Sequence, residues 1–177
     1  TDTDAQIVIV DRQHRPGGHW NDAYPFVRLH QPAAQYGVNS RELCHGTKET
    51  VGLNAGMYGL SSGAELTAYF EQLMQQRFLP SGRVRYLPNS DYLGDGRMVS
   101  RISPSSWTAR VRRKVVDTTD LEGAVPATSA PPFEVADGVR CVPAGDVARS
   151  AQRPERYVVI GGGKTALDTC VWLLQSG

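Results

Sequence analysis

The segment that most restricts what this chain can fold into is residues 157–166, which read YVVIGGGKTA. Four apolar residues lead into the spacing G-x-G-x-x-A at Gly161, Gly163 and Ala166. The first glycine permits a tight reversal from strand to helix, and the second lets backbone N–H groups approach a diphosphate. The small third residue lets the helix pack closely on the strand. This pattern predicts a dinucleotide-binding turn.

The residues after the turn continue the same unit. Residues 165–174 carry apolar side chains at helical spacing, so we expect a helix whose N-terminal amides face an anion. Residues 156–177 would then be the first strand and helix of a dinucleotide-binding unit, with Lys164 and Thr165 at the cofactor. The alternative is a tight turn between strand and helix that binds nothing.

A second nucleotide-binding signal comes from residues 7–10, which read IVIV and are followed by Asp11. An apolar run of this length is typical of a buried parallel strand. In a Rossmann unit an acid at the end of the second strand accepts a hydrogen bond from a ribose hydroxyl. The glycine turn expected about twenty residues before that acid is absent from the sequence. We therefore expect the second strand of one unit and the first strand and helix of another.

Three motifs in the first thirty residues point to a family. Asp11 and Arg12 are followed by RPGGHW at residues 15–20 and by YPFVR at residues 24–28. This order resembles the acid, G-G-x-W and Y-P-x-x-R run of FAD- and NAD(P)H-dependent oxidoreductases of the flavin-containing and Baeyer–Villiger monooxygenase type. In that family the first Rossmann unit binds FAD, and a second unit inserted within it binds NADPH. With the later glycine turn, the resemblance extends over nearly the whole chain.

The resemblance implies three groups of site residues. The first group would bind FAD by holding the adenosine ribose, approaching the diphosphate and packing against the cofactor. It comprises Asp11, Arg12, Gly17, Gly18 and Trp20. The group at the NADP(H) diphosphate is Gly161, Gly163, Lys164, Thr165 and Ala166. The group near the flavin and nicotinamide is Arg28, His30 and Gln31, of which Arg28 and His30 are the predicted catalytic residues.

The sequence departs from this family in three ways. It has no FAD-side glycine turn, and no F-x-G-x-x-x-H fingerprint precedes Tyr157. His30 stands where Baeyer–Villiger enzymes carry an acid, two residues after the motif arginine. The resemblance therefore implies a section of an oxidoreductase that passes hydride from nicotinamide to flavin, a monooxygenase-like flavoprotein whose organic reaction stays open.

Composition excludes several other classes. A net charge of +1 gives no electrostatic case for nucleic acid or a membrane surface, and no apolar run is long enough to span a bilayer. Cys44, Cys141 and Cys170 have no zinc or redox spacing, and their odd number is typical of a reducing cytoplasm. We expect a cytoplasmic protein without a metal site that acts on a small-molecule substrate.

The remaining pattern predicts the rest of an α/β fold. Apolar residues at helical spacing predict a helix over residues 66–78, ended by Pro80 and Gly82. The predicted strands cover residues 83–87, an antiparallel hairpin of 98–103 with 107–113, and 114–117. We expect a Rossmann-like parallel sheet with flanking helices and a small antiparallel hairpin or meander. The expected domains are an FAD-domain-like part at 1–120, an irregular connection at 121–155 and the second unit's first strand and helix at 156–177.

Alternatives stay open. Gly163, Lys164 and Thr165 also end a P-loop motif, with residues 114–117 as its partner strand, but Val158 stands where that motif needs glycine. A non-catalytic or truncated nucleotide-binding α/β module is the stronger alternative. If the chain folds alone, residues 156–160 would take the vacant place beside residues 7–10 in one sheet; a swapped homodimer is a variant of this arrangement.

Overall fold

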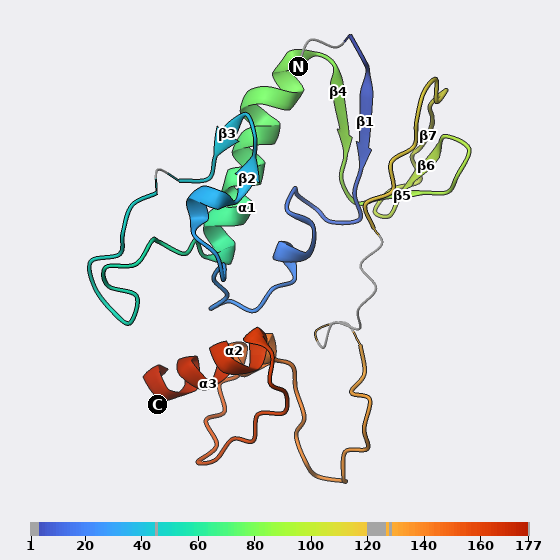
Figure 1. Cartoon of the computed structure of the whole chain (residues 1–177). Helices are drawn as coiled ribbons and strands as arrows, with labels where there is room; N and C mark the ends of the chain where they lie inside the picture. Colours follow the sequence, from blue (N-terminus) through green and yellow to red (C-terminus); the bar gives the residue numbers. More distant parts are fainter. Residues whose placement is uncertain (1–3, 45, 120–126, 128, 177) are drawn as a thin grey trace. The chain divides into compact units, whose positions relative to one another are not determined.

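The chain folds into two compact units, each drawn from two separate stretches of the sequence. In the computed structural model the described residues are 4–44, 46–119, 127 and 129–176. Unit 1 comprises residues 1–21 and 65–122, and unit 2 comprises residues 22–64 and 123–177. Figure 1 follows the chain through both units. The consecutive division into 1–120, 121–155 and 156–177 stays a prediction.

The first sheet of unit 1 is a pair of parallel strands. Strand β1 (Ile7–Val10) pairs with β4 (Val84–Leu87) in a register that runs from Ile7 opposite Val84 to Val10 opposite Leu87. Parallel neighbours need a long crossover, and helix α1 (Gly63–Leu73) lies in that connection (Figure 1). The predicted strands at 7–10 and 83–87 are confirmed.

Helix α1 supplies much of the core of unit 1. Its apolar side chains recur at helical spacing and are buried at Leu66, Tyr69 and Leu73, and Met74 directly after the helix is buried as well. The helix continues through a π-helical turn, Met74–Phe78, and a 3-10 turn, Leu79–Ser81. It ends at Gly82, whose φ of 66° is a left-handed conformation that glycine adopts without steric cost. The predicted helix and its stop are confirmed.

An antiparallel meander completes unit 1. Its strands, in sheet order, are β5 (Ser90–Tyr92), β6 (Arg97–Ser100) and β7 (Ser106–Thr108). Met98 of β6 is buried and lies opposite Trp107 of β7. The predicted hairpin forms, but its strands are shorter and its register differs from the prediction. Residues 101–103 belong to the turn instead of the first strand, and the second strand begins at Ser106 and ends at Thr108.

Unit 2 is built mainly from loops, short pairings and two helices. Two-residue strands β2 (Gly37–Val38) and β3 (Arg41–Glu42) pair antiparallel after the 3-10 turn Ala33–Gln35. Helix α2 (Ala144–Arg149) and helix α3 (Lys164–Ser176) come from its second stretch. The predicted helix after the glycine turn is therefore confirmed, and the predicted irregular connection at 121–155 contains a short helix. Residues 120–126 and 128 of that connection lie outside the described part.

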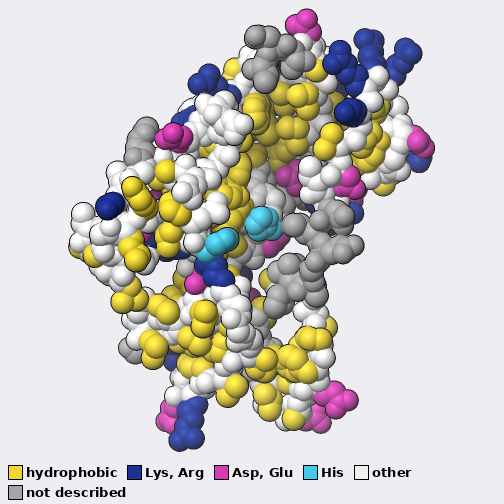
Figure 2. Space-filling view, in the orientation of Figure 1, with side chains coloured by type: hydrophobic (Ala, Val, Ile, Leu, Met, Phe, Trp, Pro, Cys, Tyr) yellow, Lys and Arg dark blue, Asp and Glu magenta, His cyan; other side chains and the backbone are white. Residues whose placement is uncertain are grey.

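Two predicted strands do not form. Residues 114–117 and 156–160 have no strand conformation, and Val158 and Ile160 are 89% and 68% exposed. Figure 2 shows apolar side chains at the surface of the part of the chain that carries α2 and α3. A strand needs a neighbour for its backbone hydrogen bonds, and within the described residues β1 pairs with β4 alone. The hypothesis that residues 156–160 lie beside β1 in one sheet is therefore wrong.

The fold class is thus α/β at the coarse level: helices with small sheets, one of them parallel. Among the residues that the structure describes, no helix is both long enough and apolar enough to cross a membrane.

Candidate functional site

The glycine turn before α3 combines a glycine-specific backbone conformation with open Cβ positions. Gly161 has a φ of 130°, a conformation essentially restricted to glycine, and a Cβ built on it would lie 3.5 Å from Cβ of Ala166. A Cβ at Gly162 or Gly163 would meet nothing within 4 Å, so both glycines are open on that side. The helix begins at Lys164, and its first N–H groups have no partner within the helix.

The side chain of Lys164 is directed along the helix and away from the turn. Its ammonium group pairs with the carboxylate of Asp168 one helical turn later, and it lies 3.5 Å from the Tyr24 hydroxyl. The Tyr24 hydroxyl in turn donates to Asp168 Oδ2 at 2.7 Å. Thr165 makes a side-chain hydrogen bond with Tyr24 as well. The three charged or phenolic groups therefore form one cluster within unit 2.

Burial has a clear electrostatic effect on Tyr24. Desolvation is the largest cause that raises the pKa of Tyr24 above its usual value, and the hydrogen bond and negative charge of Asp168 raise it further. Tyr24 therefore stays a neutral donor to Asp168 through the physiological range. Beside it, the ring of Phe26 stacks on Trp172 of α3, with centroids 5.0 Å apart and planes 11° from parallel. The Y-P-x-x-R segment is thus attached to the helix that follows the glycine turn.

Arg28 and His30 share one face of an extended segment. Val27 and Leu29 are buried, whereas Arg28 and His30 between and after them are exposed. Arg28 pairs with Glu49 at 2.9 Å and donates to the carbonyl of Leu60 at 3.3 Å.

His30, two residues after Arg28, lines a surface hollow, and Gln31 is half-buried. The structure thus places both predicted catalytic residues in unit 2, with Arg28 bracing a loop and His30 open to a ligand.

Asp11, the acid predicted to hold the FAD ribose, lies in unit 1 at the carboxyl end of β1. Asp11 Oδ1 accepts the Gln13 amide at 2.9 Å, and Asp11 Oδ2 accepts the Tyr86 hydroxyl at 3.3 Å. Burial, then the charge of Asp11 and this hydrogen bond, raise the pKa of Tyr86. A carboxylate has about four acceptor sites, so Asp11 keeps capacity for a ribose hydroxyl.

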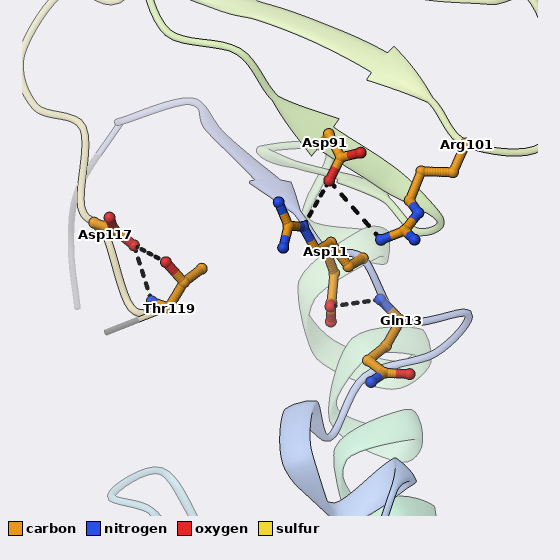
Figure 3. A network of polar contacts seen from close by, with 7 residues as sticks. Asp11, Gln13, Asp91, Arg101, Asp117 and Thr119 are labelled. Carbon is orange, nitrogen blue, oxygen red and sulfur yellow. Dashed lines mark hydrogen bonds and ion pairs between the residues drawn. The ribbon is translucent and has the colours of Figure 1, made fainter. Parts of the chain in front are cut away.

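Arg12 points to the meander. Its Nε lies 2.6 Å from Asp91 Oδ1, and Arg101 approaches the same oxygen at 3.9 Å (Figure 3). Both arginines are largely exposed, so these pairs add little stability. Figure 3 also shows Asp117, which accepts hydrogen bonds from the amide and hydroxyl of Thr119 at 2.9 and 2.6 Å. These bonds lower the pKa of Asp117, and they close a local turn where the P-loop alternative needs the end of a strand.

The G-G-x-W segment is held by Asn21. Asn21 Nδ2 donates to the carbonyls of Arg15 and Gly18, and the Trp20 amide donates to the Gly17 carbonyl at 3.1 Å. Gly17 has a φ of 126°, and a Cβ there would lie 3.3 Å from Thr67 Cγ2 of α1. Close packing on α1 therefore requires glycine at this position, whereas Gly18 faces open space.

The predicted site residues are divided between the two units. The group in unit 1 is Asp11, Arg12, Gly17, Gly18 and Trp20, and the group in unit 2 is Arg28, His30, Gln31, Gly161, Gly163, Lys164, Thr165 and Ala166. In the described part of the chain no cluster of His, Cys, Asp or Glu could hold a metal ion.

Sequence reasoning missed the polar partners of these residues. Asp168 had a signal in the sequence, since it follows Lys164 at the i,i+4 spacing of helical ion pairs. Tyr86 and Lys48 had none, because their roles depend on contacts with other segments of the chain. Asn21 contacts residues close to it in the sequence, but no spacing rule marks those contacts.

Comparison with known proteins gives relatives without an assigned function. The chain is 47% identical over 176 residues to uncharacterized proteins of Mycobacterium tuberculosis, strains ATCC 25618 / H37Rv and CDC 1551 / Oshkosh, and of Mycobacterium bovis. The match covers 99% of this chain and 32% of each relative, so the chain spans about a third of their length. No protein-family model matches the chain, and no solved structure matches it.

Proposed function

We propose that this chain is part of an FAD-dependent, NAD(P)H-using oxidoreductase of the monooxygenase-like type. The residues that support this are the acid after β1, the G-G-x-W and Y-P-x-x-R segments, and the second glycine turn. Because the chain spans about a third of its relatives' length, the activity belongs to the longer protein, to which this chain contributes two partial nucleotide-binding units.

The observation that carries the proposal is the turn before α3. Gly161 adopts a conformation essentially restricted to glycine, Ala166 is in van der Waals reach of it, and the Cβ positions of Gly162 and Gly163 are open. Those amides and the helix dipole favour a negatively charged group such as a diphosphate.

We assign roles in binding or orientation to four of the predicted residues. Asp11 accepts from the adenosine ribose, with Tyr86 fixing one of its oxygens. Gly18 leaves room for backbone to approach the FAD diphosphate. His30 faces the ligand side of its segment, while Arg28 holds the neighbouring loop through Glu49. When bound, nicotinamide and flavin supply the hydride donor and acceptor.

The same proposal includes a Rossmann-like parallel sheet in the longer protein. In a complete Rossmann-like sheet residues 157–160 would pair with parallel neighbours and become buried, which accounts for apolar side chains such as Val158 at the surface here. The β1–α1–β4 crossover is the arrangement of the second and third strands of such a sheet.

The test combines colour with cofactor titration. The purified protein is expected to carry flavin absorbance, and NADPH is expected to bind the wild-type chain about tenfold more tightly than Gly161→Ala. The strain of about 1–3 kcal/mol that alanine meets at φ 130° distorts the turn. Gly138→Ala is the matched control, because Gly138 is in the same unit, has a φ of 81° and faces open space.

Colourless protein that still binds NADPH would support the single-nucleotide module instead. Equal NADPH affinity in wild type and Gly161→Ala would contradict the proposed role of the turn.

A further inference from the structure

Unit 2 contains a surface hollow of about 400 Å³, here called the His30 hollow. Pro32 and Gly56 form part of its wall, and the side chains that matter chemically are His30, Lys48, Asn54, Met57, Tyr58 and Leu60. Small-molecule sites in proteins occupy roughly 300–1,000 Å³, so the hollow accommodates a small ligand. Of these residues, the sequence alone pointed to His30.

The hollow is built by a loop that folds back on the segment carrying His30. The Gly59 amide donates to the Thr47 carbonyl and the Glu49 amide to the Met57 carbonyl, both at 2.9 Å. Lys48 and Tyr58 face each other as an isolated antiparallel bridge in this ladder. These bonds hold the lining residues in place.

Each polar side chain of the hollow can donate a hydrogen bond, and Lys48 contributes a positive charge. None of the described residues that line it is acidic. The nearest carboxylate along the loop, Glu49, is paired with Arg28 and also accepts the Leu60 amide at 3.3 Å. The Lys48 ammonium lies 5.4 Å from the centre of the Tyr58 ring, at the wall of the hollow. His30, Asn54 and Lys48 can each donate to an anion.

The same loop exposes an unusual amount of apolar surface. Met57 and Tyr58 line the hollow and are 65% and 53% exposed, and Val51 and Leu53 nearby are more exposed still. Apolar side chains gathered beside donors are typical of a binding site, because a ligand can remove them from water while the polar groups orient it.

We propose that the His30 hollow binds a small organic carboxylate, with its anionic end at Lys48 and His30 and its apolar part over Met57 and Leu60. This site does not require bound FAD or NADPH, so it stands independently of the proposed function. In the longer oxidoreductase it would make an organic acid the substrate class.

The methionine methyl groups provide the test. The chain has three methionines: Met57 is exposed at the hollow, whereas Met74 and Met98 are 5% and 4% exposed in unit 1. In ¹³C-methyl NMR, benzoate is expected to shift the Met57 signal and leave the other two unmoved. Benzamide, which has the same shape without the charge, is expected to bind about tenfold more weakly, the effect of losing a charge-assisted hydrogen bond.

Variants identify the groups responsible. Lys48→Met should weaken benzoate binding about tenfold and leave benzamide unchanged, and Lys48→Arg should retain benzoate binding. Lys114→Met removes an equal charge from an exposed segment of unit 1 and should bind benzoate as the wild type does. The Trp172 indole signal reports whether unit 2 is folded, and if Lys48→Met disturbs it, His30→Gln takes its place with the same expected loss.

Three results would overturn the proposal: a Met57 signal unmoved by benzoate up to its solubility limit, equal affinity for benzoate and benzamide, or equal losses in Lys48→Met and Lys114→Met.

Discussion

The attachment of Tyr24 to helix α3 gives the sharpest prediction about the fold of unit 2. Tyr24→Phe removes the hydroxyl that donates to Asp168 at 2.7 Å and lies 3.5 Å from the Lys164 ammonium. The ring stays, with its centroid 4.8 Å from that of Phe26. The substitution therefore removes the interactions of the hydroxyl, of which the hydrogen bond to the Asp168 carboxylate is the strongest, and keeps the ring.

The magnitude follows from the surroundings of that bond. Hydrogen bonds to charged groups contribute about 1.5–3 kcal/mol. Because Asp168 keeps Lys164 as a partner and its side chain is 27% exposed, water offsets part of the loss. We expect Tyr24→Phe to lower the free energy of unfolding of unit 2 by about 1–1.5 kcal/mol. In a double-mutant cycle with Asp168→Asn, we expect a coupling energy of about 1 kcal/mol.

The assay needs a reporter confined to unit 2. Trp20 and Trp107 belong to unit 1, so replacing both with phenylalanine leaves Trp172, which stacks on Phe26, as the fluorescent probe during urea unfolding. Tyr58→Phe is the matched control, because its ring is exposed in the same unit and it shares no described contact with Asp168. A coupling energy near zero for Tyr24 with Asp168, or one as large for Tyr58, would refute the described attachment.

Two further predictions concern unit 1. Gly96→Ala should lower the free energy of unfolding by at least about 2 kcal/mol, because a Cβ there would lie 2.0 Å from the Ala109 carbonyl oxygen at a φ of 76°. Gly94 has a φ of 88° and faces open space, so Gly94→Ala should lower the free energy of unfolding by less, as measured by urea unfolding. Equal losses of stability in the two variants would contradict the described contact. Because the pKa of Tyr86 is raised above the usual 10.0, its neutral form stabilises the fold fully below pH 10 and this stability is lost as pH rises through the folded pKa. Tyr86→Phe should therefore lose less stability than the wild type in alkaline solution, and tyrosinate absorbance should show one fewer late-ionising tyrosine; identical alkaline profiles would contradict this.

Local sequence patterns predicted the helices and turns that depend on contacts between residues close together in the chain. The helical stripe from Leu66 to Met74 and the stop at Gly82 follow from spacing and turn chemistry between near neighbours. The presence of a hairpin followed in the same way, whereas its register, with Met98 opposite Trp107, did not. The sequence predicted β1 and β4 as separate strands, but it did not predict that they pair with each other.

The strand predicted at residues 156–160 failed for a different reason. Its residues favour a strand, but a strand's hydrogen bonds depend on a neighbour that sequence pattern cannot supply. The candidate site shows the same limit. The glycine spacing located the turn, whereas the cluster of Tyr24, Lys164 and Asp168 joins positions 140 or more residues apart and became visible through the fold.

The central claim is that the backbone amides after residue 160 receive a dinucleotide's diphosphate. Amide ¹H–¹⁵N NMR of the chain during NADPH titration tests it most directly. We predict that the amide signals of Gly162, Gly163, Lys164 and Thr165 shift together and saturate with one dissociation constant, while signals of the β5–β7 meander stay in place. Unchanged signals at those four amides, with NADPH present in saturating excess, would contradict the account.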